Sequence, residues 1–299
     1  MIKKLAIFIF LSLFLVQVQA QKKPEFVEFI NTQHAWVDSV FQTLSPKERI
    51  AQLFLVRAHT NLGQKYIDSV AQVIQKEQLG GLVVFQGGPL RHAQMLNAYQ
   101  KLTKVPLLVT YDGEWGLGMR MPDSTLSYPY QLTLGAIQNE SLLYDMGRSV
   151  AKDFQRIGMH FNFAPVVDIN NNPKNPVIGI RSFGDDKHNV ARKSGRYMHG
   201  MLDGGIIASV KHFPGHGDTD VDSHYDLPQL NHSRARLDSI EIFPFKELIS
   251  DGASAVMVAH MNIPALDNTP NIPSSISKKV VTDILRQELG FRGLIVTDA

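Results

Sequence analysis

The segment 211–224 brings together side chains that can transfer protons, bind metals or hold a substrate. It contains three histidines, three aspartates and one lysine within fourteen residues. An apolar run, residues 205–210, comes directly before it, and Pro214, Gly215 and Gly217 interrupt it. This pattern predicts a buried strand that is followed by an irregular polar loop. Catalytic groups are often carried by such loops, because the strand fixes their position while the loop faces solvent.

A metal site is one interpretation of this segment. His212 and His216 are four residues apart, a spacing that suits zinc when a helix carries both ligands, but the proline and glycines disfavour a helix here. Aspartates alternate from Asp218 onward as in a calcium loop. However, Ser223 stands where that loop needs glycine, and Gln229 stands where it needs glutamate. We therefore expect no metal and no cofactor at this segment.

An acid–base site is a second interpretation, and a solvated loop whose aspartates cap turns is a third. Asp222 lies two residues before His224, so its carboxylate can orient the imidazole and stabilise the charged ring. Histidine changes protonation near neutral pH, which suits a group that first donates a proton and later accepts one. The number of ionisable side chains in the whole segment favours the acid–base interpretation.

Apolar stretches predicted to be strands alternate with amphipathic stretches predicted to be helices. Residues 66–77 and 142–157 have apolar side chains at helical spacing, and Ser45-Pro46-Lys47-Glu48 has the pattern of a capping box that opens a helix. Continuous apolar strands separated by helices imply a parallel sheet covered by helices. The fold class we predict is α/β, a TIM-type (β/α)8 barrel truncated after about the seventh strand. The predicted strands are 53–56, 81–85, 106–111, 161–167, 206–210, 253–259 and 294–297.

Polar residues follow these predicted strands at their carboxyl ends. All strands of a parallel barrel open on one face, so side chains that are far apart in the sequence should lie close together there. A single Asp or His after a strand is more often a cap or turn residue, but several such positions together favour one site. The residues concerned are Asp112, Glu114, Asp168, Lys211, His212, His260 and Asp298.

The motif KHFPGHGDTDVDSHYDLP, residues 211–228, resembles the signature of glycoside hydrolase family 3, in its bacterial β-N-acetylglucosaminidase (β-hexosaminidase) branch. The resemblance is to the N-terminal catalytic domain of that family and extends from about Trp36 to the last residue. Four further blocks are similar to those of the family: residues 162–168, 176–184, 257–260 and 290–299.

The resemblance implies a retaining exo-β-N-acetylhexosaminidase that removes terminal β-linked N-acetylglucosamine from a glycan or muropeptide. By motif position, Asp298 is the expected nucleophile, and His224 supported by Asp222 is the expected acid and base. The implied role is turnover of peptidoglycan or of amino sugars. A β-glucosidase-type member of the same family is an alternative, although the His–Asp pair is typical of the hexosaminidase branch. A non-catalytic sugar-binding barrel is the other alternative.

The resemblance also implies which residues hold the sugar: Asp112, Arg181, Lys211 and His212. For Arg181, an ion pair with the nearby Asp185 or Asp186 is the structural alternative. His216, Asp168 and His260 stay open between a role in the site and a bracing role. Trp115 departs from the family pattern, which more often has glycine after Asp-Gly-Glu, so the wall beside the sugar is not defined by the resemblance.

The N-terminus predicts a secretory signal peptide over residues 1–20. Lys3 and Lys4 precede an apolar core, residues 5–16, which is too short for a confident membrane span, and a small-residue cleavage site ends at Ala20. We expect a secreted protein, periplasmic or extracellular, without a stable membrane anchor. Its barrel domain would occupy residues 21–299 and be incomplete at the C-terminus, so we expect further sequence or a further domain beyond it.

Composition narrows the function further. The formal net charge of +2 includes both lysines of the signal peptide, so the processed chain is close to neutral and nucleic acid is not an expected partner. Neither disulfides nor thiolate metal sites can form, because the sequence contains no cysteine. At 299 residues with 44% hydrophobic content, the chain can bury a core of the size that an α/β barrel needs.

Overall fold

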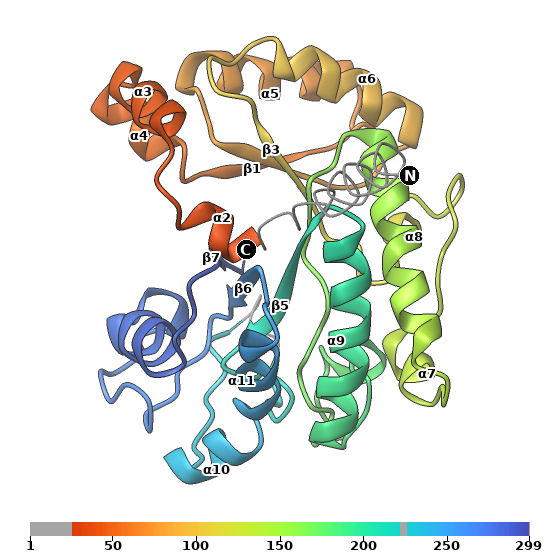
Figure 1. Ribbon diagram of the computed structural model, residues 1–299, viewed down its shortest axis with the longest axis vertical. Helices are drawn as coiled ribbons and strands as arrows, with labels where there is room; N and C mark the ends of the chain where they lie inside the picture. The colour runs from red at the N-terminus through yellow and green to blue at the C-terminus, as the bar shows by residue number, and fades with distance from the viewer. Residues whose placement is uncertain (1–25, 222–225, 299) are drawn as a thin grey trace, which may run out of the picture.

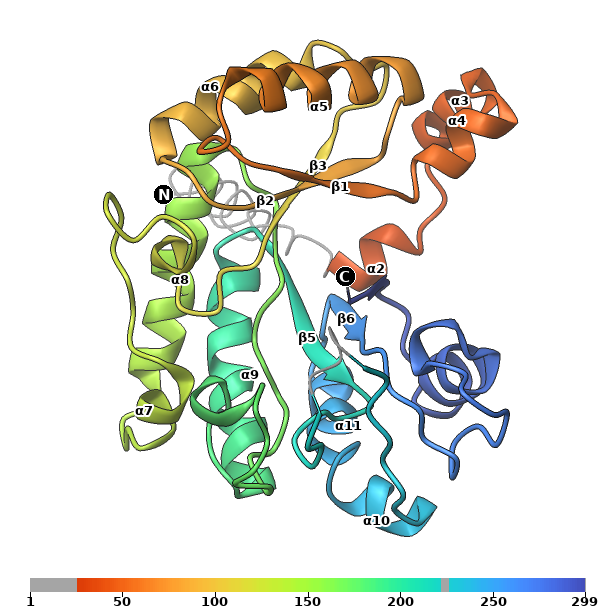
Figure 2. The same ribbon diagram turned by 180° about the vertical axis from the view of Figure 1, so that it is seen from behind.

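The computed structural model describes residues 26–221 and 226–298. The predicted signal peptide and the pair Asp222 and His224 lie outside the described residues. Within these described residues, seven parallel strands form one curled sheet in chain order, and the first and the last strand are its two edges (Figures 1 and 2). The strands are β1 (Leu55–Ala58), β2 (Gly81–Val84), β3 (Leu108–Tyr111), β4 (Phe161–Asn162), β5 (Ile207–Phe213), β6 (Ala255–Val258) and β7 (Leu294–Thr297).

Helices cover the outer face of the curled sheet, as the α/β prediction requires (Figure 1). The two longest helices, α8 (Ser141–Ile157) and α9 (Lys187–Asp203), cross closely. A Cβ atom on Gly147 of α8 would lie only 2.4 Å from the carbonyl oxygen of Tyr197 in α9. No helix in the described ranges 26–221 and 226–298 is long and apolar enough to cross a membrane. The α-helices are α2 (Phe26–Ile30), α3 (Ala35–Thr43), α4 (Pro46–Ala51), α5 (Gln64–Glu77), α6 (Pro89–Gln100), α7 (Gln131–Gly135), α8 (Ser141–Ile157), α9 (Lys187–Asp203), α10 (Arg234–Ser239) and α11 (Phe243–Ser250).

The described residues also contain helical elements that are not α-helices. Three of them are single 3₁₀ turns, and one is a π-helix between the last two strands. They are η1 (Leu117–Met119), η2 (Gly179–Arg181), η3 (Ser274–Ile276) and the π-helix η4 (Lys279–Glu288).

Alternation along the strands divides the core into two layers. In β2, Leu82 and Val84 belong to the large cluster between the sheet and its helices, whereas Val83 faces the smaller cluster inside the curl. Phe161 and Met257 fill this inner cluster from two other strands. Both faces of the sheet are therefore apolar, which explains why its strands are continuous apolar runs in the sequence.

Most of the predicted elements are confirmed. In the described residues a strand overlaps each of the seven predicted stretches, and α5 and α8 cover the two predicted amphipathic helices. The fourth strand is much shorter than predicted, because it ends at Asn162 and not at Val167. The capping box at α4 forms in both directions, because Glu48 N donates to Ser45 Oγ and Ser45 N donates to Glu48 Oε2 at 2.8 Å. The first strand begins two residues later than the sequence predicts: Leu53 and Phe54 are exposed after α4, and pairing begins at Leu55.

The fifth strand is longer than predicted, which corrects the placement of Lys211 and His212. The sequence predicts both in the loop after Val210, but both belong to β5. The backbone of Lys211 pairs with the segment after β4: its N–H donates to the carbonyl of Pro165 at 3.2 Å, and its carbonyl accepts from Val167 at 2.7 Å. These bonds extend the strand past its apolar part, so both polar side chains have rigid backbones.

Candidate active site

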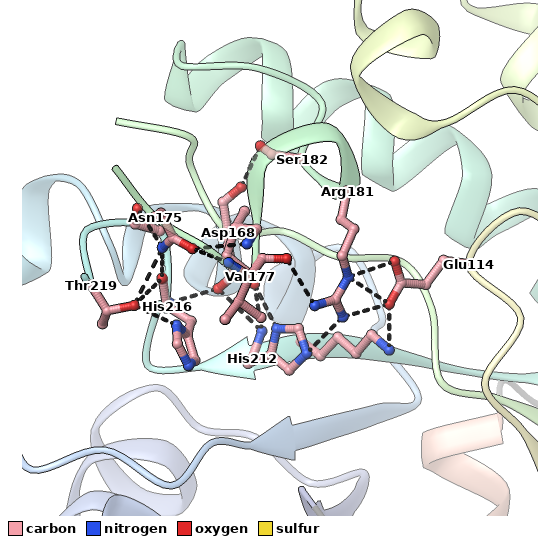
Figure 3. Close-up of polar contacts among 12 residues, drawn as sticks. Glu114, Asp168, Asn175, Val177, Arg181, Ser182, His212, His216 and Thr219 are labelled. Atoms are coloured by element: carbon pink, nitrogen blue, oxygen red, sulfur yellow. Dashed lines mark hydrogen bonds and ion pairs between the residues drawn. The ribbon is translucent and has the colours of Figure 1, made fainter. Parts of the chain in front are cut away.

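A buried carboxylate, Glu114, lies at the centre of an ionic cluster at the carboxyl ends of the strands (Figure 3). It accepts hydrogen bonds from Arg181 Nη2 at 2.6 Å and from Arg181 Nε at 3.0 Å. Lys211 Nζ is 2.9 Å from the same carboxylate. The forked contact with the guanidinium fixes both groups in one plane, which a single contact would not do. Arg181 is thus held by a residue that follows β3, and the alternative of a pair with Asp185 or Asp186 is wrong.

Asp112 forms the second part of this ionic cluster. Lys211 Nζ donates to Asp112 Oδ1 at 2.6 Å, so the ammonium bridges the two carboxylates that follow β3. Arg120 donates to the other oxygen of Asp112 through Nη2. The cluster therefore contains two carboxylates and three cations before the next acidic group, Asp168, is added.

Mutual attraction keeps these groups charged despite their burial. Burial alone would raise the pKa of Asp112, but the ammonium of Lys211 and the guanidinium of Arg120 hold it below its usual value. Burial is also the largest single influence on Glu114 and opposes its ionisation, but Arg181 and Lys211 together outweigh it and lower the pKa of the carboxyl. For Lys211, burial lowers the pKa, but the two carboxylates outweigh that effect and raise it. The site is thus a fixed set of full charges at neutral pH.

His212 links this cluster to Asp168. Its Nδ1 is 2.7 Å from Asp168 Oδ2, and its Nε2 is 3.3 Å from Arg181 Nη2. A carboxylate only accepts and a guanidinium only donates, so the neutral imidazole carries its proton on Nδ1 and accepts through Nε2. Burial would raise the pKa of Asp168, but His212 and His216 lower it below its usual value. Three charged carboxylates thus face the three cations Arg120, Arg181 and Lys211.

Asp168 also holds the beginning of the loop after β5. Its Oδ1 accepts from the backbone N–H of His216 at 2.7 Å (Figure 3). Asn175, in the segment after β4, donates to the next carbonyls of this loop, those of His216 and Gly217, at 2.8 Å and 3.0 Å. Gly217 is required by close packing, because a Cβ atom there would lie 1.8 Å from the carbonyl oxygen of Ile169. The first part of the loop is therefore tightly fixed.

His216 belongs to this loop and is buried, and its imidazole makes a hydrogen bond within the loop. Its Nδ1 is 2.7 Å from Thr219 Oγ1. Burial lowers the pKa of the ring, and the nearby His212 lowers it further. The rings of His212 and His216 lie edge to face, with centroids 6.0 Å apart. Each Nδ1 is thus occupied by a different partner, Asp168 for one ring and Thr219 for the other, so the two rings do not offer paired Nδ1 atoms to a metal.

Asp298 follows β7 at the same edge of the sheet. Its backbone N–H donates to the carbonyl of Val258 at 2.9 Å. Its carbonyl is 2.9 Å from His260 Nε2, which must donate because a carbonyl can only accept. His260 Nδ1 is held in turn by Ser275 Oγ at 2.6 Å. His260 therefore fixes the backbone of Asp298, which supports the bracing role that the sequence left open.

Exposure separates the side chains that can meet a substrate from those behind them. The side chains of Asp112, Arg120 and Arg181 are 19%, 21% and 20% exposed, whereas those of Lys211 and Glu114 are 2% and 0% exposed. The three partly exposed side chains thus form a surface that can both donate and accept hydrogen bonds. The buried two fix its geometry from below.

An aromatic wall adjoins this surface at the ends of β1 and β2. The guanidinium of Arg120 lies 4.9 Å from the ring centroid of Phe85, and His59 stacks on the same ring at 5.2 Å. Trp115, where the sequence departs from the family pattern, packs edge to face on Tyr130. The wall next to Asp112 is therefore formed by Phe85, Arg120 and His59.

The structure brings together the four residues predicted to bind the sugar, Asp112, Arg181, Lys211 and His212, in one network. Sequence reasoning listed Glu114 among the polar residues that follow the strands, as the third residue after a predicted strand, but gave it no specific role. It missed Arg120. Arg120 lies eight residues after Asp112, on the far side of η1, and no local pattern marks it.

Comparison with known proteins shows the family of the chain. Residues 45–299 match the model of the glycosyl hydrolase family 3 N-terminal domain. The chain belongs to this family. It is 32% identical over 252 residues to a β-hexosaminidase A of Pseudoalteromonas piscicida, a match that covers 77% of this chain and 42% of the relative.

Solved structures also share the fold of this chain. A family 3 β-N-acetylglucosaminidase from Paenibacillus sp. str. FPU-7 superimposes with a TM-score of 0.77 at 36% identity, covering 86% of this chain and 49% of that one. A structure of the β-glucoside phosphorylase BglX bound to 2FGlc gives a TM-score of 0.82 at 28% identity, covering 88% and 48%. The chain thus spans about half the length of these relatives.

Proposed function

We propose that this protein is a retaining exo-β-N-acetylhexosaminidase that removes terminal β-linked N-acetylglucosamine. The observation that carries the proposal is the charge-balanced cluster at the carboxyl ends of the strands, in a chain that belongs to glycosyl hydrolase family 3. The relative from Pseudoalteromonas is named a β-hexosaminidase, and the Paenibacillus neighbour is a β-N-acetylglucosaminidase. Both names support N-acetylglucosamine as the sugar.

In this proposal, the partly exposed side chains bind the terminal sugar. Asp112 accepts hydrogen bonds from sugar hydroxyls, and Arg120 and Arg181 donate to sugar oxygens, one of them to the 2-acetamido group. Lys211 and His212 keep their predicted place in the sugar site and act from just behind this surface. Because all of these groups are fixed by ion pairs before the sugar arrives, little ordering accompanies binding.

The proposed chemistry follows the retaining route. The carboxylate of Asp298 attacks the anomeric carbon and forms a covalent bond to it, while the bond to the leaving oxygen breaks. His224 gives its proton to that oxygen and later takes a proton from the water that hydrolyses the glycosyl–enzyme intermediate. Asp222 orients the imidazole and stabilises its charged form. The position of Asp298 at a strand end, with its backbone held on both sides, suits a nucleophile that needs accurate placement.

The proposed setting is outside the cytoplasm. The N-terminal residues 1–20 have the pattern of a secretory signal, so we propose a periplasmic or extracellular enzyme. Terminal β-linked N-acetylglucosamine in that setting is supplied by peptidoglycan fragments and related amino-sugar glycans. Turnover of such fragments is the proposed role.

Hydrolysis of matched chromogenic substrates tests the activity. We expect aryl β-N-acetylglucosaminide to be cleaved with a higher kcat/KM than aryl β-glucoside, and the first sugar product to keep the β configuration. The structural likeness to a β-glucoside phosphorylase makes two controls necessary, the glucoside itself and inorganic phosphate as an added acceptor. Preference for glucoside, or a sugar phosphate as the main product, would contradict the proposal.

A further inference from the structure

The segment 219–231, which contains the proposed acid–base pair in its sequence, has the residues at its two ends joined by a hydrogen bond. Asp218 stands directly before this segment and His232 directly after it. His232 Nε2 donates to Asp218 Oδ2 at 2.8 Å, and both side chains are partly buried. The loop after β5 is thus closed at its base by a contact between its two stems.

Arg236 strengthens this closure from α10. Its Nη2 is 3.4 Å from Asp218 Oδ2 and 2.9 Å from Glu241 Oε1. The end of the loop is fixed to the same helix, because Ser233 caps α10 by accepting from the backbone N–H of Arg236. The guanidinium therefore joins the first stem of the loop to the helix that follows the second stem.

Glu241 anchors the cluster to the body of the barrel. It is buried, and its Oε1 also accepts from Asn171 Nδ2 at 3.2 Å, in the segment after β4. Gly215 lies directly on it, since a Cβ atom on Gly215 would be 2.7 Å from Glu241 Cβ. The base of the loop thus packs on a buried residue rather than facing solvent.

A bound metal is the less favoured explanation of this cluster. In the described residues, Asp218, His232 and Glu241 offer ligand atoms that all lie within 4.8 Å of one another. However, Arg236 already forms ion pairs with both carboxylates and supplies the compensating positive charge. A cation at the same place would have to displace this guanidinium. The arrangement is therefore better suited to holding two pieces of chain together.

We propose that Asp218, His232 and Arg236 form a clasp that positions the acid–base loop during catalysis. They are positioning residues, because they act through Asp222 and His224 and do not touch the substrate. This inference rests on the proposed function, in which those two residues deliver and accept the proton. Displacement of a catalytic group by about 1 Å costs on the order of a hundredfold in rate, so loosening the clasp should slow the proton-dependent step.

Leaving-group dependence tests the clasp in the intact protein. Asp218→Asn keeps the size of the side chain and removes its charge. We expect it to lower kcat/KM by about ten- to a hundredfold for substrates with poor leaving groups, and by much less for activated aryl substrates that need little protonation. The matched control is Asp238→Asn, which removes an exposed carboxylate from the ion pair with Arg234 on the same helix. Equal losses on both substrate classes, or the same profile in the control, would overturn the proposal.

A double-mutant cycle tests whether the two stems act as a pair. His232→Gln should reproduce the leaving-group profile of Asp218→Asn, and the double variant should be little worse than either single one, because the contact is already lost. Asp218→Glu, which keeps the charge, should recover part of the activity. Multiplicative losses in the double variant would show independent effects and would contradict the clasp.

Hydrogen exchange separates this inference from the proposed function. In Asp218→Asn we expect faster amide exchange over residues 219–231 and unchanged exchange in α8 and α9. If the wild type hydrolyses no β-N-acetylglucosaminide, the proposed function fails whatever the exchange shows. If the wild type is active but Asp218→Asn leaves both exchange and the leaving-group profile unchanged, the clasp alone fails.

Discussion

Glu114→Gln should be strongly destabilising, because it removes the buried negative charge between Arg181 and Lys211 while keeping the shape of the side chain. The carboxylate accepts from Arg181 at 2.6 Å and 3.0 Å and lies 2.9 Å from Lys211 Nζ, with none of its surface exposed. Removing one partner of a buried ion pair costs about 3–5 kcal/mol. Lys211 keeps its contact with Asp112 at 2.6 Å, so we expect the lower end, about 3 kcal/mol at neutral pH.

The pH dependence of this loss gives a second signature. Burial opposes ionisation of Glu114, but Arg181 and Lys211 lower the pKa of its carboxyl far below the usual value. The unfolded chain therefore binds this proton at a higher pH than the folded chain does. The stability due to Glu114 is fully present above the unfolded-state pKa of about 4.3 and is lost as the pH falls toward the folded-state pKa. The difference between wild type and variant should thus shrink below about pH 4.

Urea unfolding at pH 7, pH 4 and pH 3 measures both effects. Glu140→Gln is the matched control, because Glu140 also faces two cations, Arg192 at 3.2 Å and Arg196 at 3.8 Å, but at the surface. Such exposed pairs contribute about 0–1 kcal/mol. If Glu114→Gln costs no more than the control at pH 7, or if its cost is the same at pH 3, the charge of Glu114 does not stabilise the folded chain through Arg181 and Lys211.

Further predictions concern the proposed chemistry. His224→Ala should slow hydrolysis of substrates with poor leaving groups by about 10²–10⁴-fold and that of activated aryl glycosides much less, and Asp222→Ala should give a similar but milder profile; equal losses would refute the acid–base assignment. A fluorinated activated sugar should leave a covalent adduct on Asp298, visible as a mass shift of its peptide; an adduct elsewhere would refute the assignment as nucleophile. Asp168→Asn should lower kcat/KM on both good and poor leaving groups, with the larger loss on poor ones; a loss confined to poor leaving groups would show that Asp168 serves the loop alone.

The sequence predicts the sheet well because its strands are buried on both faces. Such strands are continuous apolar runs, and that pattern predicts each of the seven. Errors arise where hydrogen bonding, not hydrophobicity, decides the boundary. Lys211 is polar and follows the apolar run, yet its backbone pairs with Pro165 and Val167, so the strand continues through it. The partner segment lies some distance away in the chain, and no local pattern reports it.

The candidate site was predictable in its members but not in its contacts. A polar residue after a strand can be read from the sequence, which is how Asp112, Lys211 and Asp298 were found. Which partner each side chain meets depends on the curvature of the sheet. Arg181 pairs with a carboxylate 67 residues away, not with a neighbouring aspartate, and Lys211 reaches across 99 residues to Asp112. Arg120 was missed because its place in the site exists only after these strands lie side by side.

Asp168 connects the two parts of the site. One of its oxygens holds His212 Nδ1, which orients the ring that accepts from Arg181, and the other holds the backbone N–H of His216 at the start of the loop. A carboxylate is suited to this double task because it has two acceptor oxygens and no donor, whereas an amide offers only one acceptor. The proposed sugar-binding surface and the stem of the proposed acid–base loop are therefore positioned by the same buried group.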